Sequence, residues 1–312
     1  MAAERVASAP RVVRRSRLGR QEMVEGYLFL LPWALGFLLF IAGPMVASLY
    51  LSFTKYDIAR PPTFVGLANY RQAFGSDPRF WPSLGRTFYY ALVVVPLGIV
   101  LSMLLAVLLN QKLRGTNIFR TLYFLPHLTP IVATAVIWKW IFQPSFGLLN
   151  YSLSRVGVAG PGWLGSVEWA IPALMIMALW RSAGGNAMMI FLAGLQGIPQ
   201  DLYEAAAIDG AGRWDRFRHV TVPMLSPTIF FNLILGIIGS LQVFTSALVA
   251  TNGGPAYATW FYALHIYNEA FVFFKMGYAA ALAWIFFLII LAITFIQVRA
   301  SGRWVYYAGE NA

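Results

Sequence analysis

The chain has 312 residues, of which 59% are apolar and only 11% are charged, whereas soluble domains have about 25% charged residues. It carries 23 Lys and Arg against 12 Asp and Glu, which gives a net charge of +11, and it contains no cysteine. This composition indicates a membrane protein. It excludes a disulfide framework, a thiol nucleophile and a cysteine-ligated metal site.

Six apolar segments have roughly the 20 residues that a helix needs to cross a bilayer. They cover residues 27–51, 87–109, 122–142, 170–195, 227–251 and 278–298. Because an unpaired backbone group in hydrocarbon costs several kcal/mol, each segment is expected to be helical. The predicted fold is therefore all-α, a polytopic membrane bundle of six transmembrane helices. Prolines at positions 32, 44, 96, 130 and 172 are expected to kink these helices.

The distribution of Lys and Arg predicts the orientation, since cationic loops are retained on the cytoplasmic side. With the N-terminus inside, the cytoplasmic segments carry 14 of them and the external loops seven. Both termini are therefore predicted to be cytoplasmic: residues 1–26 as a basic tail, 27–298 as the membrane domain and 299–312 as a C-terminal tail. The basic tail is expected to touch anionic membrane lipid, and we expect no nucleic-acid partner. The first apolar run is long for a signal peptide and is interpreted as a retained helix.

The polar segment 198–227, between the fourth and fifth spans, has the pattern of two helices joined by a turn. Pro199 suits a first helical position, and Gly210 can adopt the left-handed conformation that closes a helix. Pro223 is expected to terminate the second helix. The expected helices cover residues 199–209 and 213–220. From the residues alone, this loop either docks on another protein through its alanines or is a turn whose alanines pack on neighbouring helices.

The stretch EAAAIDGAGRWDRFRHVTVP, from Glu204 to Pro223, resembles the EAA loop of ABC importer permeases. The residues on that pattern are Glu204, Ala205, Ala206, Asp209, Gly210, Ala211 and Pro223, while Val222 replaces the usual Leu. Segments 64–74, 120–126, 191–199, 251–255 and 267–271 also resemble the maltose and glycerol-phosphate class of carbohydrate permeases. The resemblance covers most of residues 27–298.

This resemblance implies a permease in the bacterial inner membrane that passes a carbohydrate or related polyol. Glu204, Ala205, Ala206, Asp209, Gly210 and Ala211 would then couple the chain to its ATPases. The implied partners are a second homologous permease subunit, two cytoplasmic ABC ATPase subunits and an extracytoplasmic solute-binding protein. ATP and Mg are expected on the ATPases and no cofactor on this chain, because it has no GxxxxGK[ST] motif to hold phosphates. The chain is thus expected not to be an enzyme.

Polar residues at membrane depth are candidates for a solute pathway. The candidates are Trp180, Arg181 and Asn186 on the fourth span and Ser240, Gln242 and Phe244 on the fifth. Hydroxyls and amides can exchange hydrogen bonds with sugar hydroxyls, and an aromatic face can cover a sugar ring. Gly184 and Gly185 are expected to form a flexible stretch beside them. Arg181 pairs either with a phosphate on the solute or with a carbonyl of a neighbouring helix.

An ion-coupled secondary transporter of a small polar solute is the main alternative from another functional class. All twelve acidic residues fall outside the predicted spans, whereas ion coupling often uses a buried carboxylate. A metal site is not expected, because His127, His219 and His265 lie on separate segments without a carboxylate at ligand spacing. The external segment 52–86 is expected either to meet a binding protein or to cap the bundle.

Overall fold

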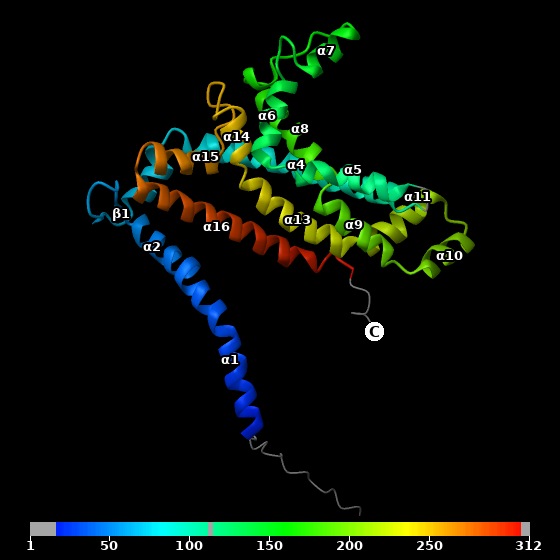
Figure 1. The fold of residues 1–312 in the computed structure, drawn as a ribbon, viewed down its shortest axis with the longest axis horizontal. Helices are drawn as coiled ribbons and strands as arrows, with labels where there is room; N and C mark the ends of the chain where they lie inside the picture. The colour runs from blue at the N-terminus through cyan, green and yellow to red at the C-terminus, as the bar shows by residue number, and fades with distance from the viewer. Residues whose placement is uncertain (1–16, 112–114, 307–312) are drawn as a thin grey trace, which may run out of the picture. The chain divides into compact units, whose positions relative to one another are not determined.

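The computed structural model of the protein describes residues 17–111 and 115–306, which are almost entirely helical (Figure 1). The chain divides into two units, residues 1–51 and residues 52–312. Three predicted features lie outside the described residues: the tail up to position 16, the cations Lys112 and Arg114, and the end of the C-terminal tail from position 307.

The first unit is a helical segment that begins with α1 (Arg17–Phe37), continues through the π turn η1 (Leu38–Ala42) and ends with α2 (Gly43–Ser52). It has no charged residue from position 26 to position 52. The range Arg20–Ser52 is long and apolar enough to cross a membrane, and it contains the predicted first span.

The second unit opens with a short folded segment outside the spans. Strands β1 (Thr54–Lys55) and β2 (Thr63–Phe64) pair antiparallel, with Thr54 opposite Phe64. The helix α3 (Ala68–Arg71) and the π turn η2 (Gln72–Ser76) follow. The buried Asn69 amide donates to the carbonyls of Ser52 and Thr54, at 2.8 and 2.9 Å, and so fixes α3 to the hairpin.

The long helices of the second unit confirm four more of the predicted spans. They are α4 (Phe80–Leu109), α8 (Ala170–Ala183) with α9 (Asn186–Gln196), α13 (Ser226–Leu241) with α14 (Thr245–Ala250), and α16 (Met276–Ser301). Helix α4 contacts α8, α9 and α13 and therefore lies at the centre of the unit. It begins at Phe80 rather than at the predicted residue 87, because its first turns are buried against the rest of the unit.

The predicted third span is not one continuous helix. It is broken into α5 (Thr116–Leu128) and α6 (Ile131–Ile141), which meet at 95°. The cause is Pro130, because a proline disfavours helical geometry in the residue before it. Thr129 accordingly adopts an extended conformation, with φ −68° and ψ 131°. Among the described residues there are thus five long spans, or six if this bent pair is one.

Shorter elements connect the spans. Helix α7 (Leu148–Arg155) and the 3-10 turn η3 (Trp163–Gly165) precede α8, and α15 (Tyr262–Tyr267) with the π turn η5 (Asn268–Val272) precedes α16. The loop before α13 contains α10 (Gln200–Ile208), α11 (Arg213–Arg216), η4 (Phe217–Thr221) and α12 (Val222–Met224). The expectation that Pro223 terminates a helix is wrong, since it lies in the first turn of α12. A proline is tolerated in the first turn of an α-helix. Here the π turn η4 gives way to α12, so Pro223 lies in such a first turn.

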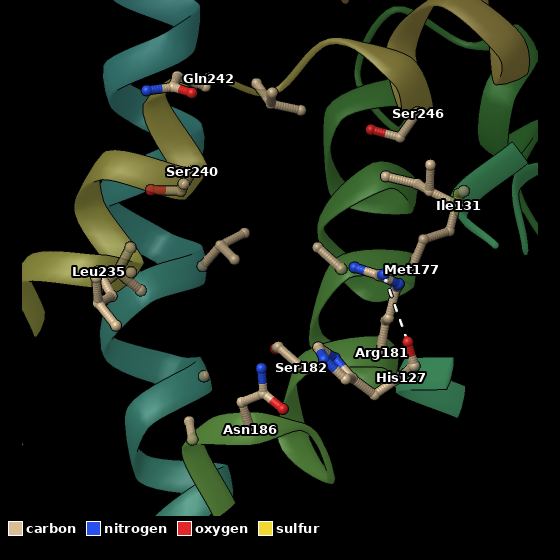
Figure 2. Close-up of a pocket in the computed structure, with 18 of the residues that line it drawn as sticks. His127, Ile131, Met177, Arg181, Ser182, Asn186, Leu235, Ser240, Gln242 and Ser246 are labelled. Atoms are coloured by element: carbon tan, nitrogen blue, oxygen red, sulfur yellow. Dashed lines mark hydrogen bonds between the residues drawn. The ribbon is translucent and has the colours of Figure 1, made fainter. Parts of the chain in front are cut away.

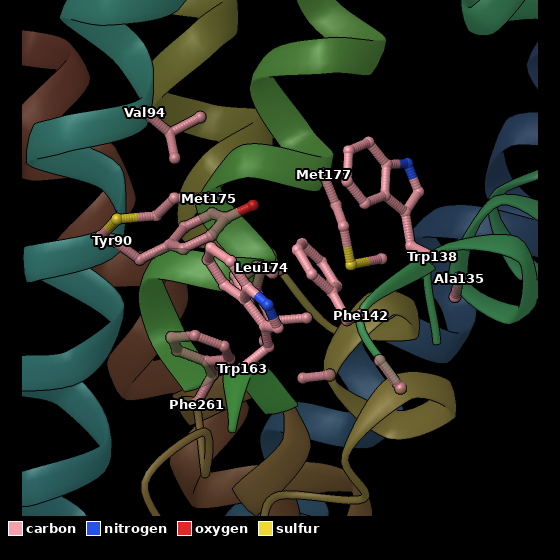
Figure 3. Packing of buried hydrophobic residues seen from close by; sticks show 14 of the residues in the cluster. Tyr90, Val94, Ala135, Trp138, Phe142, Trp163, Leu174, Met175, Met177 and Phe261 are labelled. Atoms are coloured by element: carbon pink, nitrogen blue, oxygen red, sulfur yellow. The ribbon is translucent and has the colours of Figure 1, made fainter. Parts of the chain in front are cut away.

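An apolar cluster holds α6, η3 and α8 together (Figure 3). Phe142 packs between Trp138 and Trp163, with ring centroids 4.9 and 5.1 Å apart. Aromatic pairs of this kind contribute about 0.5–1.5 kcal/mol beyond the area they bury. Leu174 and Met177 of α8 belong to the same cluster, which gives α8 a fixed position beside α4.

Candidate functional site

A cavity of about 500 Å³ lies among the long helices of the second unit (Figure 2). Helices α4, α8, α9 and α13 form most of its wall, and α5, α6 and α14 contribute at their ends. The polar side chains in the wall are Tyr90, Ser102, His127, Thr134, Arg181, Ser182, Asn186, Asn232, Ser240, Gln242, Thr245 and Ser246. Its volume falls within the ~300–1,000 Å³ that small-molecule sites occupy. The cavity can therefore hold a polar solute of modest size.

The cavity brings together five of the six residues predicted for the solute pathway. Arg181 and Asn186 line it from α8 and α9, and Ser240, Gln242 and Phe244 line it from α13 and the link to α14. Trp180 does not line it, and its indole packs edge-on against Trp138 at 5.7 Å. Consecutive helical residues point about 100° apart, so Trp180 and Arg181 face different neighbours. That these residues bind solute stays a prediction.

Gly184 and Gly185, at the break between α8 and α9, are buried rather than a loose stretch. A Cβ on Gly184 would lie 2.0 Å from the carbonyl oxygen of Tyr123, and one on Gly185 would lie 2.8 Å from Nδ1 of His127. The absence of side chains at this pair therefore lets α5 approach α8 closely. This approach brings His127 to the cavity.

The guanidinium of Arg181 is only weakly held by the protein. Its Nη2 donates to the carbonyl oxygen of His127 at 3.5 Å, which is longer than the ~2.7–3.2 Å of an ordinary hydrogen bond (Figure 2). Its Nε is buried and has no hydrogen-bond partner. In the described part of the chain the ion pairs are His265 with Asp77 and Lys275 with Glu269, and neither involves Arg181.

The predicted coupling residues lie on an exposed loop. Glu204 and Ala205 of α10 are exposed and Ala206 is half-buried, while Ile208, at the end of α10, is 87% exposed. Asp209 and Gly210 end the helix as expected, with Gly210 at φ +83°. The amide of Ala211, the last of the predicted residues, donates to the carbonyl of Ala206 at 2.9 Å and closes the turn.

Internal hydrogen bonds connect the parts of this loop. The hydroxyls of Tyr203 and Thr221 are 3.0 Å apart and join α10 to η4. The carboxylate of Asp215 accepts a hydrogen bond from the amide of Gly212 at 3.1 Å and caps α11. The loop therefore connects α9 to α13 through hydrogen-bonded helical elements.

Residues 98–305, which carry most of the cavity wall and the whole loop, match the model of a protein family described as binding-protein-dependent transport system inner membrane component. The chain belongs to this family.

Individual relatives agree with the family assignment over nearly the whole chain. This chain is 40% identical to the probable ABC transporter permease protein YesP of Bacillus subtilis, and the match covers 96% of this chain and 97% of YesP. It is 37% identical to the lactose transport system permease protein LacF of Rhizobium radiobacter, covering 92% and 97%. The crystal structure of a bacterial ABC transporter involved in the import of the acidic polysaccharide alginate has a TM-score of 0.81 at 25% identity, covering 92% and 99%.

Membership of this family of inner membrane transport components makes the chain a transport subunit rather than an enzyme. It favours the binding-protein-dependent importer over the ion-coupled alternative. The cavity agrees with this, because none of the described residues in its wall is acidic.

The structure also contains a buried polar group that the sequence analysis did not detect, here called the Asp77 cluster: Asp77, Arg79, Trp260, His265 and Tyr278. One oxygen of Asp77 accepts from Tyr278 Oη at 2.5 Å and from His265 Nε2 at 2.8 Å, and the other accepts from the Arg79 amide at 2.8 Å. Trp260 Nε1 donates to His265 Nδ1 at 3.3 Å. In this network Nε2 of His265 donates to Asp77, and Nδ1 accepts from Trp260.

The environment of Asp77 lowers the pKa of its carboxyl group. Burial alone would raise this pKa, but the hydrogen bonds from Tyr278 and the Arg79 amide, together with the attraction and hydrogen bond of His265, outweigh it. Asp77 is therefore ionised at neutral pH. It joins the segment before α4 to α15 and to the start of α16.

Proposed function

We propose that the chain is the transmembrane permease subunit of an ATP-driven importer of carbohydrate or a related polyol, and that the cavity is part of its solute pathway. The observation that carries this proposal is that the cavity and the exposed loop share two helices. Helices α9 and α13 both line the cavity, and the loop with α10 connects their ends. A force on the loop therefore moves two walls of the cavity.

The polar side chains in the wall of the cavity suit a solute that is rich in hydroxyl groups. Ser240 and Gln242 on one side and Ser182 and Asn186 on the other offer hydroxyl and amide groups (Figure 2). Such groups both donate and accept hydrogen bonds, as sugar hydroxyls do. The name of the lactose permease relative supports the same class of solute.

The coupling partner in this proposal is a cytoplasmic ATPase that docks on the loop. Ile208 is 87% exposed and Trp214, six residues further along the same loop, is 69% exposed, and large apolar side chains exposed on a polar loop suit a protein contact. Glu204 gives the same surface a charge. Two ABC ATPase subunits hold ATP and Mg, and a second homologous permease completes the membrane part.

The proposed orientation puts the loop and both termini in the cytoplasm. Three arginines in the loop, at positions 213, 216 and 218, support this side. Residues 1–26 and 299–312 are then cytoplasmic tails of the permease domain 27–298. The opposite end, which carries the β1 and β2 hairpin, faces an extracytoplasmic solute-binding protein.

The test is sugar uptake and sugar-stimulated ATP hydrolysis by the chain reconstituted with its second permease, ATPases and binding protein. Glu204→Lys should lower uptake about tenfold or more, because it reverses the charge of the docking surface. Membrane insertion and melting temperature should not change, since Glu204 is exposed. Glu22→Lys, a charge reversal at an exposed position outside the loop, is the matched control and should transport normally.

Normal uptake by Glu204→Lys would contradict the coupling assignment. Uptake that needs no ATPase and follows an ion gradient would instead support a secondary transporter.

A further inference from the structure

The cavity contains a fixed positive charge without a negative partner. Arg181 lines it, no described residue in the wall is an Asp or Glu, and neither ion pair of the described residues includes Arg181. Its buried Nε has no hydrogen-bond partner, and its Nη2 has only the 3.5 Å contact with the carbonyl of His127. At least one donor of this guanidinium is therefore available for a ligand.

A charge at membrane depth is unfavourable unless it faces a cavity or a counter-charge. Arg181 faces a cavity, and its position is well defined, since α8 is packed on both the apolar cluster and α4. A guanidinium cannot lose its proton, so the site stays cationic at any physiological pH. An anion in the cavity would supply the missing charge and accept the unused donor.

The two sides of the cavity differ in charge. Arg181 lies on one side together with Ser182 and Asn186, whereas Ser240 of α13 and Gln242 just after it face Arg181 with neutral groups (Figure 2). This arrangement suits a solute with an oxyanion at one end and hydroxyl groups at the other. The planar fork of a guanidinium matches carboxylate, phosphate and sulfate oxygens.

We propose that the solute is an acidic sugar, and that Arg181 binds its oxyanion during passage through the cavity. This inference rests on the proposed function, because it specifies which carbohydrates the pathway takes. Its observable consequence is a preference for an acidic sugar over the neutral sugar of the same ring and linkage. The preference depends on the guanidinium at position 181.

The test uses the complete reconstituted importer and matched pairs of probes. The pairs are the α-1,4-linked dimers of galacturonate and galactose, glucuronate- and glucose-containing disaccharides, and glucose 6-phosphate and glucose 6-sulfate against glucose. At least one acidic member should be taken up about tenfold or more faster than its neutral counterpart, in line with the strength of charge-assisted hydrogen bonds. Which acidic member is taken up identifies the oxyanion.

Variants then assign the preference to the cavity rather than to the binding protein. Arg181→Gln should reduce uptake of the acidic probe about tenfold or more, with an unchanged melting temperature and unchanged binding of the probe to the separate binding protein. Arg181→Lys keeps the positive charge but loses the planar fork of donors. Its uptake of the acidic probe should therefore lie between that of the native chain and that of Arg181→Gln. Arg86→Gln removes a half-buried guanidinium from α4 that does not line the cavity, and it should leave uptake unchanged.

Three outcomes would overturn the inference. If neutral sugars are taken up and Arg181→Gln does not affect them, the charge has no role in selection, although the chain remains a sugar permease. If Arg181→Gln lowers uptake of acidic and neutral sugars equally and also lowers the melting temperature, Arg181 has a structural role. If no sugar of either kind is taken up, both this inference and the proposed function are wrong.

Discussion

The Asp77 cluster and the central cavity each place a charged side chain inside the second unit, but the chain satisfies these charges differently. The carboxylate of Asp77 accepts three hydrogen bonds of 2.5 to 2.8 Å from the chain itself. The guanidinium of Arg181 has one contact of 3.5 Å and a buried nitrogen without a partner. A charge that the fold satisfies stabilises the fold, whereas a charge left unsatisfied in a cavity is available to a ligand.

The same contrast holds for the residues around each charge. Arg79 next to Asp77 has its guanidinium 4.6 Å from the ring of Tyr257 and donates to the hydroxyl of that residue at 3.0 Å. In the cavity, Asn186 and Gln242 are exposed, and their amides make no hydrogen bond with the described part of the chain. Substitutions in the cluster should therefore reduce stability, and substitutions in the cavity should reduce transport.

The largest effect on stability is expected for Asp77→Ala. Removing the carboxylate leaves the donors of Tyr278 and His265 buried without an acceptor, and breaking a buried charged network costs about 3–5 kcal/mol. Thermal unfolding of the purified chain in detergent measures this loss. Asp57→Ala is the matched control, because Asp57 lies outside the cluster and its carboxylate accepts only an exposed hydrogen bond from the Arg60 amide, at 3.1 Å. Equal melting temperatures for the two variants would show that the cluster is not a structural element.

The pH dependence of stability tests the contribution of the Asp77 carboxylate in a second way. Since the pKa of Asp77 is lower in the folded state, its contribution is fully present above the ordinary value of 3.8 and is lost as the pH falls through the folded pKa. Stability of the native chain should therefore fall below about pH 3.8 in part because Asp77 becomes protonated. In Asp77→Asn this part of the acid sensitivity should be absent, and an unchanged acid profile would argue against the assignment.

A smaller loss of stability is expected for Gly184→Ala, at the close approach of α5 to the wall of the cavity. The new Cβ would lie 2.0 Å from the carbonyl oxygen of Tyr123, so the backbone must shift, and overpacking of this kind costs about 1–3 kcal/mol. Gly85→Ala is the control, since a Cβ at Gly85 in α4 meets nothing within 4 Å. It should be neutral or stabilising by up to about 1 kcal/mol. Melting curves of the two variants measure this difference in stability. Equal melting temperatures would mean that α5 does not pack against Gly184 as described.

The sequence was sufficient to predict five of the six membrane spans and the helical character of the loop before α13, because these signals are local. Apolar length located the helices, and Gly210 correctly marked the end of α10. The prediction was less complete at Pro130. This proline predicted a kink, but not a 95° break between α5 and α6. The size of such a bend depends on tertiary packing that a local pattern does not contain.

The sequence could not predict contacts between distant segments. His265 and Tyr278 lie 188 and 201 positions from Asp77, so no spacing rule connects them. Trp180 was predicted to line the solute pathway because of its residue type. The direction of its side chain around the helix axis, however, depends on packing against Trp138. Sequence therefore predicted five of the six side chains on the fourth and fifth spans, but not the contributions of α4, α5 and α6 to the wall.

The smallest effect on stability is expected within the cavity itself, for Asn186→Ala and Gln242→Ala. Each removes an exposed amide without a hydrogen bond to the described residues, and such substitutions change stability by only about 0.5 kcal/mol or less. Uptake should nevertheless fall several-fold, because each amide offers a donor and an acceptor to the solute. Asn117→Ala, which removes an exposed amide of α5 outside the cavity, should change neither quantity. If Asn186→Ala and Gln242→Ala instead destabilise the chain and transport normally, these amides support the fold, and the difference between the cavity and the Asp77 cluster would not reflect a division between solute binding and structure.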